Sequence, residues 1–434
     1  MPSRQTQAAR PNGRSKHAPK CVPAVWFSAI ALAVFGACDT PGVTLVDPDI
    51  SNRNDRGTTI HVTLEDSALA EALGWSQGVP NALVQLHRDV DPFRPDTLYT
   101  DSTGHISVTD LLPGYYRVAA YRTSPGEQSD TSTRAFGDGF RTNLPAAIEL
   151  GMAADRAGSL VVSELFPGGT WPDGIQYDWE GFFELYNNSD TTVYLDGMLW
   201  GWALGRGGSA LHSCDEQRPF REDPLGLWSL EFHQFPGTGM DYPVAPGQVV
   251  TVARDAVDHS VVHPALPDLS QADFELEGTI DPDNPDVPNL PTVGLGYNLL
   301  GHGMVTYPSK VYYLAQAIDP TSLETAILPS GSKYARIPTD HIIDVVNGAG
   351  VSLDGASTPT PPNKLCRAVN RSFDRLGYAF YRPVSDFRDP LAATWSIQRR
   401  VLKLTEGGRP ILQDLNTSFL DFIVATRSTG SIEF

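Results

Sequence analysis

The sequence lacks the short motifs that carry most enzyme chemistry. Its 434 residues contain no G-x-S-x-G nucleophile elbow, no glycine-rich phosphate-binding loop, no H-E-x-x-H pair and no paired-cysteine metal motif. One hypothesis for the function is a hydrolase whose site is built from acids and histidines scattered along the chain, and it has no support in the sequence. We therefore predict that the protein is not an enzyme.

Basic residues are scarce as well. The chain has 32 Lys and Arg against 51 Asp and Glu, which gives a net charge of -19. All five basic residues before Cys38 stand in a stretch without acidic residues, so the remainder carries 27 basic and 51 acidic residues, and 27 − 51 = −24. A protein with this large negative charge repels the phosphate backbone of nucleic acids, so we expect no nucleic acid as a partner.

The amino terminus combines these basic residues with an apolar run of 14 residues, 22–35. That run is too short to span a membrane, and it ends in small residues before Cys38. The pattern is typical of a secretion signal over residues 1–37. The alternative is a short buried helix.

The junction Val34-Phe35-Gly36-Ala37-Cys38 resembles the cleavage box of bacterial lipoproteins, although Phe35 stands where an aliphatic residue is usual. The resemblance implies that Cys38 carries lipid and anchors the chain to a membrane. We expect an outer-membrane lipoprotein of the bacterial cell envelope. The polar, turn-prone residues 38–56 then form a flexible tether.

The chain has only four cysteines. If Cys21 leaves with the signal and Cys38 takes lipid, Cys214 and Cys366 remain in an oxidising compartment. They are candidates for one disulfide. Two separate buried thiols are the alternative, and the sequence leaves both open because it cannot place their α-carbons within bridging distance.

Residues 57–150 alternate short strands with turns. In NALVQLHRD, for example, the period of two places Ala82, Val84 and Leu86 on one face. The phrases VPNALVQLHRD and TDSTGHISVTDLLPGYYRVAAY are similar to carboxypeptidase-regulatory-like and transthyretin-like modules, which implies an immunoglobulin-like sandwich. Some relatives crosslink themselves through Lys and Asn. No lysine occurs between Lys20 and Lys310, so that crosslink is excluded here.

Residues 157–434 begin with FFELYNN and VYLDG, which resemble the start of a lamin-tail domain. The phrases FPGTGMDYPVAPGQVVTVARDAVDH, SIQRRVLKL and ILQDLNTSFLDF resemble DUF4876 bacterial lipoproteins, a family of undetermined function, and that resemblance runs from about residue 57 to 425. The fold class is therefore mainly all-β. We expect two immunoglobulin-like β-sandwich domains, the second larger and with long loops and short helices.

Within this second domain we expect Trp200 in the core and a final hairpin around Glu406-Gly407-Gly408. A short helix is expected over 254–262. Glu164, Glu184 and Asp196 are expected at loop or edge positions.

Two acidic or histidine patterns are candidate metal sites. Asp414, Asn416 and Asp421 alternate oxygen ligands as calcium loops do, but the glycine that such loops need is missing. The alternative is that they fix a turn through hydrogen bonds to the backbone. His259 and His263 stand four residues apart, a spacing that places two imidazoles on one face of a helix, where they could bind a metal ion. The alternative is that they are two partly exposed polar residues near a helix end.

A Gly/Pro/Asp-rich insertion, residues 168–181, carries Trp171, Tyr177 and Trp179. These aromatics are candidates for a surface that meets a partner, although core packing explains most tryptophans equally well. The leading hypothesis is a lipid-anchored binding or accessory protein of the cell envelope. By analogy with the family, its partner is a TonB-dependent outer-membrane receptor, and a glycan is the other candidate. The alternative is a structural or adhesive surface protein without a soluble ligand.

Overall fold

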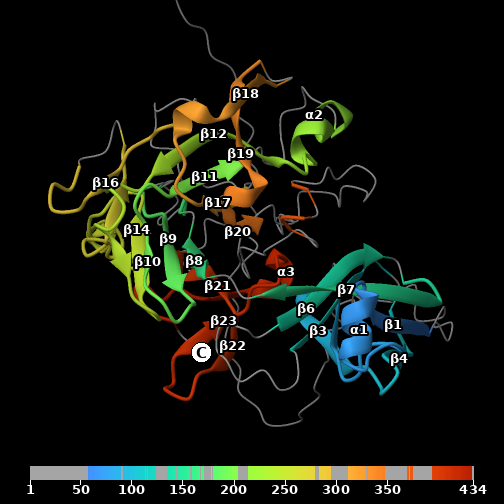
Figure 1. Ribbon diagram of the computed structural model, residues 1–434. Helices are drawn as coiled ribbons and strands as arrows, with labels where there is room; N and C mark the ends of the chain where they lie inside the picture. Colours follow the sequence, from blue (N-terminus) through green and yellow to red (C-terminus); the bar gives the residue numbers. More distant parts are fainter. Residues whose placement is uncertain are drawn as a thin grey trace, which may run out of the picture. The chain divides into compact units, whose positions relative to one another are not determined.

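The computed structural model describes residues 57–432, except for 89–90, 113, 115, 124–133, 143, 157–158, 167, 171–176, 178, 204–213, 279–282, 295–310, 329–330, 348–368, 371 and 375–392. The chain divides into two compact units, Met1–Asn52 and Arg53–Phe434, and all described residues lie in the second. Strands dominate the described residues and helices are few, so the prediction of an all-β protein is confirmed (Figure 1).

A seven-stranded sheet in the order β3-β2-β5-β6-β7-β1-β4 forms the N-terminal module. Its core contains Val84 and Leu86 from one face of β2 and Ala82 just before the strand, as the alternation predicts. Strand β1 pairs in parallel with β7 and antiparallel with β4. The elements are β1 (Thr58–Leu64), α1 (Ser67–Ala72), β2 (Leu83–Arg88), β3 (Asp91–Tyr99), β4 (His105–Val108), β5 (Tyr116–Thr123), β6 (Arg134–Thr142) and β7 (Ala147–Arg156).

The larger sandwich has two sheets, in the orders β16-β15-β14-β9-β8-β21-β24 and β18-β19-β12-β11-β17-β20. Two short pairs, β10-β13 and β22-β23, accompany them. The strands of the first sheet are β8 (Leu160–Phe166), β9 (Phe182–Asn187), β14 (Val249–Ala253), β15 (Phe274–Leu276), β16 (Asn289–Leu290), β21 (Trp395–Arg399) and β24 (Phe422–Thr426). Those of the second are β11 (Leu199–Ala203), β12 (Gly226–Gln234), β17 (Val311–Ala315), β18 (Glu324–Ile327), β19 (Lys333–Pro338) and β20 (Ile342–Asn347).

The remaining elements are short. They are β10 (Val193–Tyr194), α2 (Cys214–Arg221), β13 (Pro243–Val244), η3 (His259–Val261), η5 (Pro320–Ser322), η6 (Thr339–His341), β22 (Val401–Leu404), β23 (Pro410–Leu412) and α3 (Ser418–Asp421). The hairpin of β22 and β23 confirms the turn expected around Glu406. The helix expected over 254–262 is only the three-residue turn η3, because Pro264 and Pro267 follow it closely.

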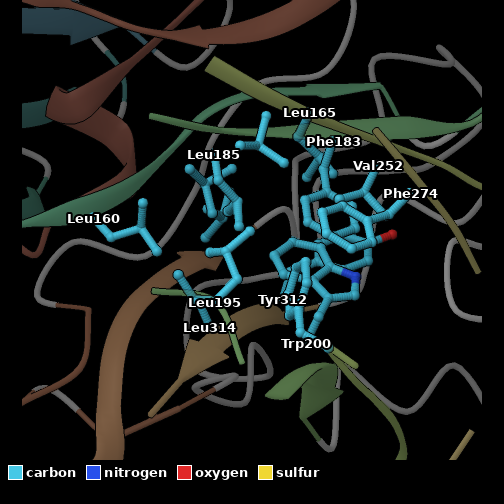
Figure 2. Packing of buried hydrophobic residues seen from close by; sticks show 14 of the residues in the cluster. Leu160, Leu165, Phe183, Leu185, Leu195, Trp200, Val252, Phe274, Tyr312 and Leu314 are labelled. Carbon is cyan, nitrogen blue, oxygen red and sulfur yellow. The ribbon is translucent and has the colours of Figure 1, made fainter. Parts of the chain in front are cut away.

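The core of the larger sandwich lies between its two sheets. The indole of Trp200 from β11 stacks on Phe183 from β9 with ring centroids 3.7 Å apart, and on Tyr312 from β17 at 5.7 Å (Figure 2). All three side chains are fully buried. Trp200 is therefore a core residue, as predicted, and it joins the two sheets.

Asp196 lies in the turn after β10, where the sequence places it. Its carboxylate accepts hydrogen bonds from the backbone N–H groups of Gly239, Asp241 and Tyr242 at 2.8 to 3.0 Å. These donors favour the charged form, so they hold the pKa of Asp196 below its usual value although burial opposes this. Asp196 thus fixes the loop 237–242 against the start of β11.

Candidate functional site

The insertion between β8 and β9 closes on itself. Tyr177 and Thr170 form an antiparallel bridge, in which the Tyr177 N–H donates to the Thr170 carbonyl at 2.8 Å. The Glu180 carboxylate accepts hydrogen bonds from the Thr170 N–H at 2.9 Å and from its hydroxyl at 2.6 Å. The described part of this insertion is therefore held in one conformation by contacts between its two ends.

A second contact ties the insertion to η3. His259 is fully buried, and its Nε2 lies 2.9 Å from the Asp255 carbonyl. Because a carbonyl only accepts, Nε2 carries the proton and Nδ1 is the acceptor. The Tyr177 hydroxyl accordingly donates to Nδ1, 2.7 Å away. Burial lowers the pKa of His259, which keeps the ring neutral, as this arrangement requires.

Trp179, the other described aromatic of the insertion, packs against a buried arginine. Its side chain is half-buried, and the Arg254 guanidinium lies over the ring at 4.8 Å from the centroid. Arg254 itself is buried, so the indole has a fixed cationic support on one side. Trp171, the third predicted surface aromatic, lies outside the described residues.

The acidic groups near the insertion are held in an apolar setting. Burial raises the pKa of Glu180 to about 7, although hydrogen bonds from Thr170 oppose the rise. Burial, followed by the charges of Asp255 and Glu180, raises the pKa of Tyr177 to about 12. At neutral pH the phenol therefore keeps the proton that it donates to His259.

The candidate calcium residues surround a buried arginine instead. The Arg399 guanidinium lies 3.3 Å from Asp414 and 3.9 Å from Asp421, and it also pairs with Asp344. Asp421 accepts hydrogen bonds from the backbone N–H groups of Leu415 and Thr417, both at 3.0 Å. The two backbone hydrogen bonds of Asp421 are those that the turn-fixing alternative predicts. The Arg399 guanidinium supplies a positive charge beside Asp414 and Asp421, where a calcium ion would otherwise supply it.

Asn416 lies at the tip of this turn with a positive φ of 49°, which asparagine tolerates better than most residues. Among the described residues, no three His, Cys, Asp or Glu side chains gather in a group that could hold a metal ion. His259 and His263 do not converge: the second ring is half-buried and its Nδ1 accepts from the Ala265 N–H at 3.2 Å. The expectation that both histidines are partly exposed is wrong for His259.

The cysteine predictions fall largely outside the described residues. Cys38 and Cys366 are not described, and Cys214 is described only as the first residue of α2. No helix in the described part of the chain is long and apolar enough to cross a membrane.

Sequence reasoning missed two buried polar groups. Glu164 and Glu184 were expected at loop or edge positions, but they lie inside β8 and β9, both almost fully buried. Strands β8 and β9 lie in the interior of the sheet, so each is paired with a neighbouring strand along both of its edges. Arg399 was also missed, because its partners Asp344 and Val162 are distant in the sequence.

The comparisons with known proteins identify one region. Residues 245–429 match the family described as a protein of unknown function (DUF4876). A DUF4876 family protein from Bacteroides thetaiotaomicron, known from a crystal structure, is 17% identical; the alignment covers 87% of this chain and 98% of that one, with a TM-score of 0.49.

Two further solved structures are less similar. A DUF3823 family protein from Parabacteroides merdae is 10% identical, covers 45% of this chain and 79% of its own, and has a TM-score of 0.15. A candidate adhesin from Bacteroides ovatus is 9% identical, covers 74% of this chain and 94% of its own, and has a TM-score of 0.17. No curated protein matches the chain significantly. Residues 245–429 of the chain thus match the DUF4876 family model, the family that its sequence phrases resemble.

Proposed function

We propose that this chain is a lipid-anchored binding protein of the bacterial cell envelope that uses the 168–181 insertion to contact its partner. The observation that carries the proposal is the fixed presentation of Trp179. The insertion is closed by Thr170 and Glu180, tied to η3 through Tyr177, and supported by Arg254 under the indole. A rigid, partly exposed tryptophan loses little conformational entropy on binding, and such residues dominate the energy of many interfaces.

The proposed partner is an outer-membrane receptor of the TonB-dependent class, and the proposed role is not catalytic. The acidic pair Glu164 and Glu184 is the constellation that a hydrolase would need. Its oxygens accept hydrogen bonds from Ser428, Gly430 and Thr251, which supports a structural role for both carboxyl groups. Neither the insertion nor this pair therefore calls for catalysis.

Replacing Trp179 by alanine is expected to lower capture of the partner at least tenfold, because a central interface tryptophan typically contributes about 2 kcal/mol or more, which is roughly 30-fold in affinity. The measurement is a pull-down from detergent-solubilised envelopes with tagged wild type and variant. Tyr99→Ala is the matched control, since Tyr99 is 58% exposed and belongs to β3 of the N-terminal module. Equal capture by all three proteins contradicts the proposal, and binding to glycans or matrix alone favours the adhesive alternative.

The lipid anchor is tested separately. Cells expressing the full chain should incorporate labelled palmitate into the wild type and into Cys21→Ala, whose cysteine belongs to the predicted signal. Cys38→Ala should incorporate none, because its thiol is the proposed attachment point. Labelling of Cys38→Ala at the wild-type level contradicts anchoring at this residue.

A further inference from the structure

Two glutamates face each other across neighbouring strands in the interior of the larger sandwich. Glu164 of β8 stands opposite Glu184 of β9 in the antiparallel register. Their exposed fractions are 1% and 0%. Directly opposite side chains in an antiparallel pair have β-carbons about 5 Å apart, so the two carboxyl groups interact strongly.

The segment that follows β24 is hydrogen-bonded to this pair. Glu164 accepts from the Ser428 hydroxyl at 2.9 Å and from the Ser428 N–H at 3.1 Å. The Glu184 carboxyl accepts from the Gly430 N–H and, at 3.2 Å, from the Thr251 hydroxyl. Residues 428–430 are therefore attached to the sandwich through oxygens that belong to two titratable groups.

The charges around the pair do not neutralise it. Arg427 is the cation that acts on Glu164, but its guanidinium donates to the carbonyls of Ala393 and Ala265. Asp273 adds a further negative charge near Glu184. Two polar neighbours, Ser396 beside Glu164 and Gln398 beside Ser428, are uncharged.

The two carboxyl groups also have too few donors for two full charges. The Glu184 Oε2 atom is buried and has no hydrogen-bond partner. Burial, followed by the charge of Glu164, raises the pKa of Glu184 to about 8, and burial raises the pKa of Glu164 as well. The closed arrangement therefore retains a proton that a solvated glutamate would lose.

We propose that Glu164 and Glu184 form a proton-controlled latch, which holds residues 428–430 while the pair retains a proton and releases them when it is lost. The direction follows from linkage. Opening hydrates Glu184 and returns its pKa toward the ordinary value of 4.5, so the open state binds fewer protons than the closed state. Opening is therefore favoured as pH rises from about 4.5 to about 8, and it changes little above that.

Hydrogen exchange of the Gly430 amide tests the latch in the intact protein. One proton of difference makes the opening equilibrium rise by up to about tenfold per pH unit. After correction for the intrinsic exchange rate, the protection of Gly430 in the wild type should fall at least about 100-fold between pH 5 and pH 8, and then level off. In Glu184→Gln, which keeps the acceptor oxygen but does not titrate, the change should stay below about tenfold, the remainder coming from Glu164.

Glu71→Gln is the control, because Glu71 is exposed on α1 and should leave the wild-type profile unchanged. The amide of Phe183, inside β9, reports whether the whole sandwich opens instead. A wild-type profile that is flat between pH 5 and pH 8 overturns the proposal, whether or not Glu184→Gln folds. So does an equal fall for Gly430 in the wild type and Glu184→Gln, or a parallel fall for Phe183.

Discussion

Replacing Arg399 by glutamine is expected to lower the free energy of unfolding by about 3–5 kcal/mol at pH 7, because it leaves buried carboxylates without their cation. Arg399 is 1% exposed in its side chain and pairs with Asp344, Asp414 and Asp421. Its Nε also donates to the Val162 carbonyl at 2.8 Å. Chemical denaturation followed by tryptophan fluorescence measures the change.

The loss should shrink as pH falls. Burial opposes the charge of Arg399, but the three aspartates outweigh burial and raise its pKa, so the cation persists at neutral and acidic pH. In the variant Asp421, whose pKa burial raises, can avoid the cost by taking up a proton, and this becomes easier as pH falls. Arg336→Gln is the matched control: this arginine is 23% exposed and pairs with Asp223 and Glu324, and its removal should cost less than about 1 kcal/mol. Equal losses for the two variants would contradict the assignment.

Replacing Trp200 by alanine is expected to cost about 3–5 kcal/mol, the usual loss when a large buried aromatic is truncated. The indole lies between Phe183 and Tyr312, which belong to opposite sheets, so the cavity opens at the centre of the sandwich. Calorimetry should show a single transition at lower temperature.

Trp179→Ala provides the comparison for Trp200. Its indole is half-buried and covered on one side by Arg254, so its loss should destabilise the fold less than the loss of the fully buried Trp200. If the two variants lose similar stability, Trp200 does not hold the sheets together as described. A stable Trp179→Ala variant is also what the binding test needs.

Local patterns predicted the features that depend on near neighbours. The alternation in NALVQLHRD identified the buried face of β2, because a strand exposes every second residue to the same side. The glycines 407 and 408 marked the turn between β22 and β23. Trp200 was placed in the core because it stands in an apolar run, and the DUF4876 phrases located the family region.

The polar interior could not be predicted in this way. Glu164 reads as the end of an apolar run, and only its position in the sheet order, with β9 on one side and β21 on the other, shows that it is interior. The Arg399 partners come from β8, β20 and the 413–421 turn, so no sequence spacing connects them. Tyr177 and His259 are 82 residues apart, and their contact follows from the packing of two loops.

Asp344 explains how the sheets keep their relative register. It belongs to β20 in one sheet, yet its carboxylate accepts from the Val162 N–H at 2.7 Å and from Arg399, both in the other sheet. This buried ion pair with fixed donors therefore ties one position of β20 to one position of the facing sheet, in addition to the apolar packing between the sheets.

The sheet order also has a consequence for biosynthesis. Strand β8 is completed early, but one of its two neighbours, β21, and the Ser428 donors to Glu164 come from the last part of the described chain, 264 residues later in the case of Ser428. Until that part of the chain has been synthesised, β8 lacks its neighbour β21 and has one unpaired edge. Such a strand is prone to pair with other chains, so productive folding depends on keeping the nascent protein extended until its C-terminal strands emerge.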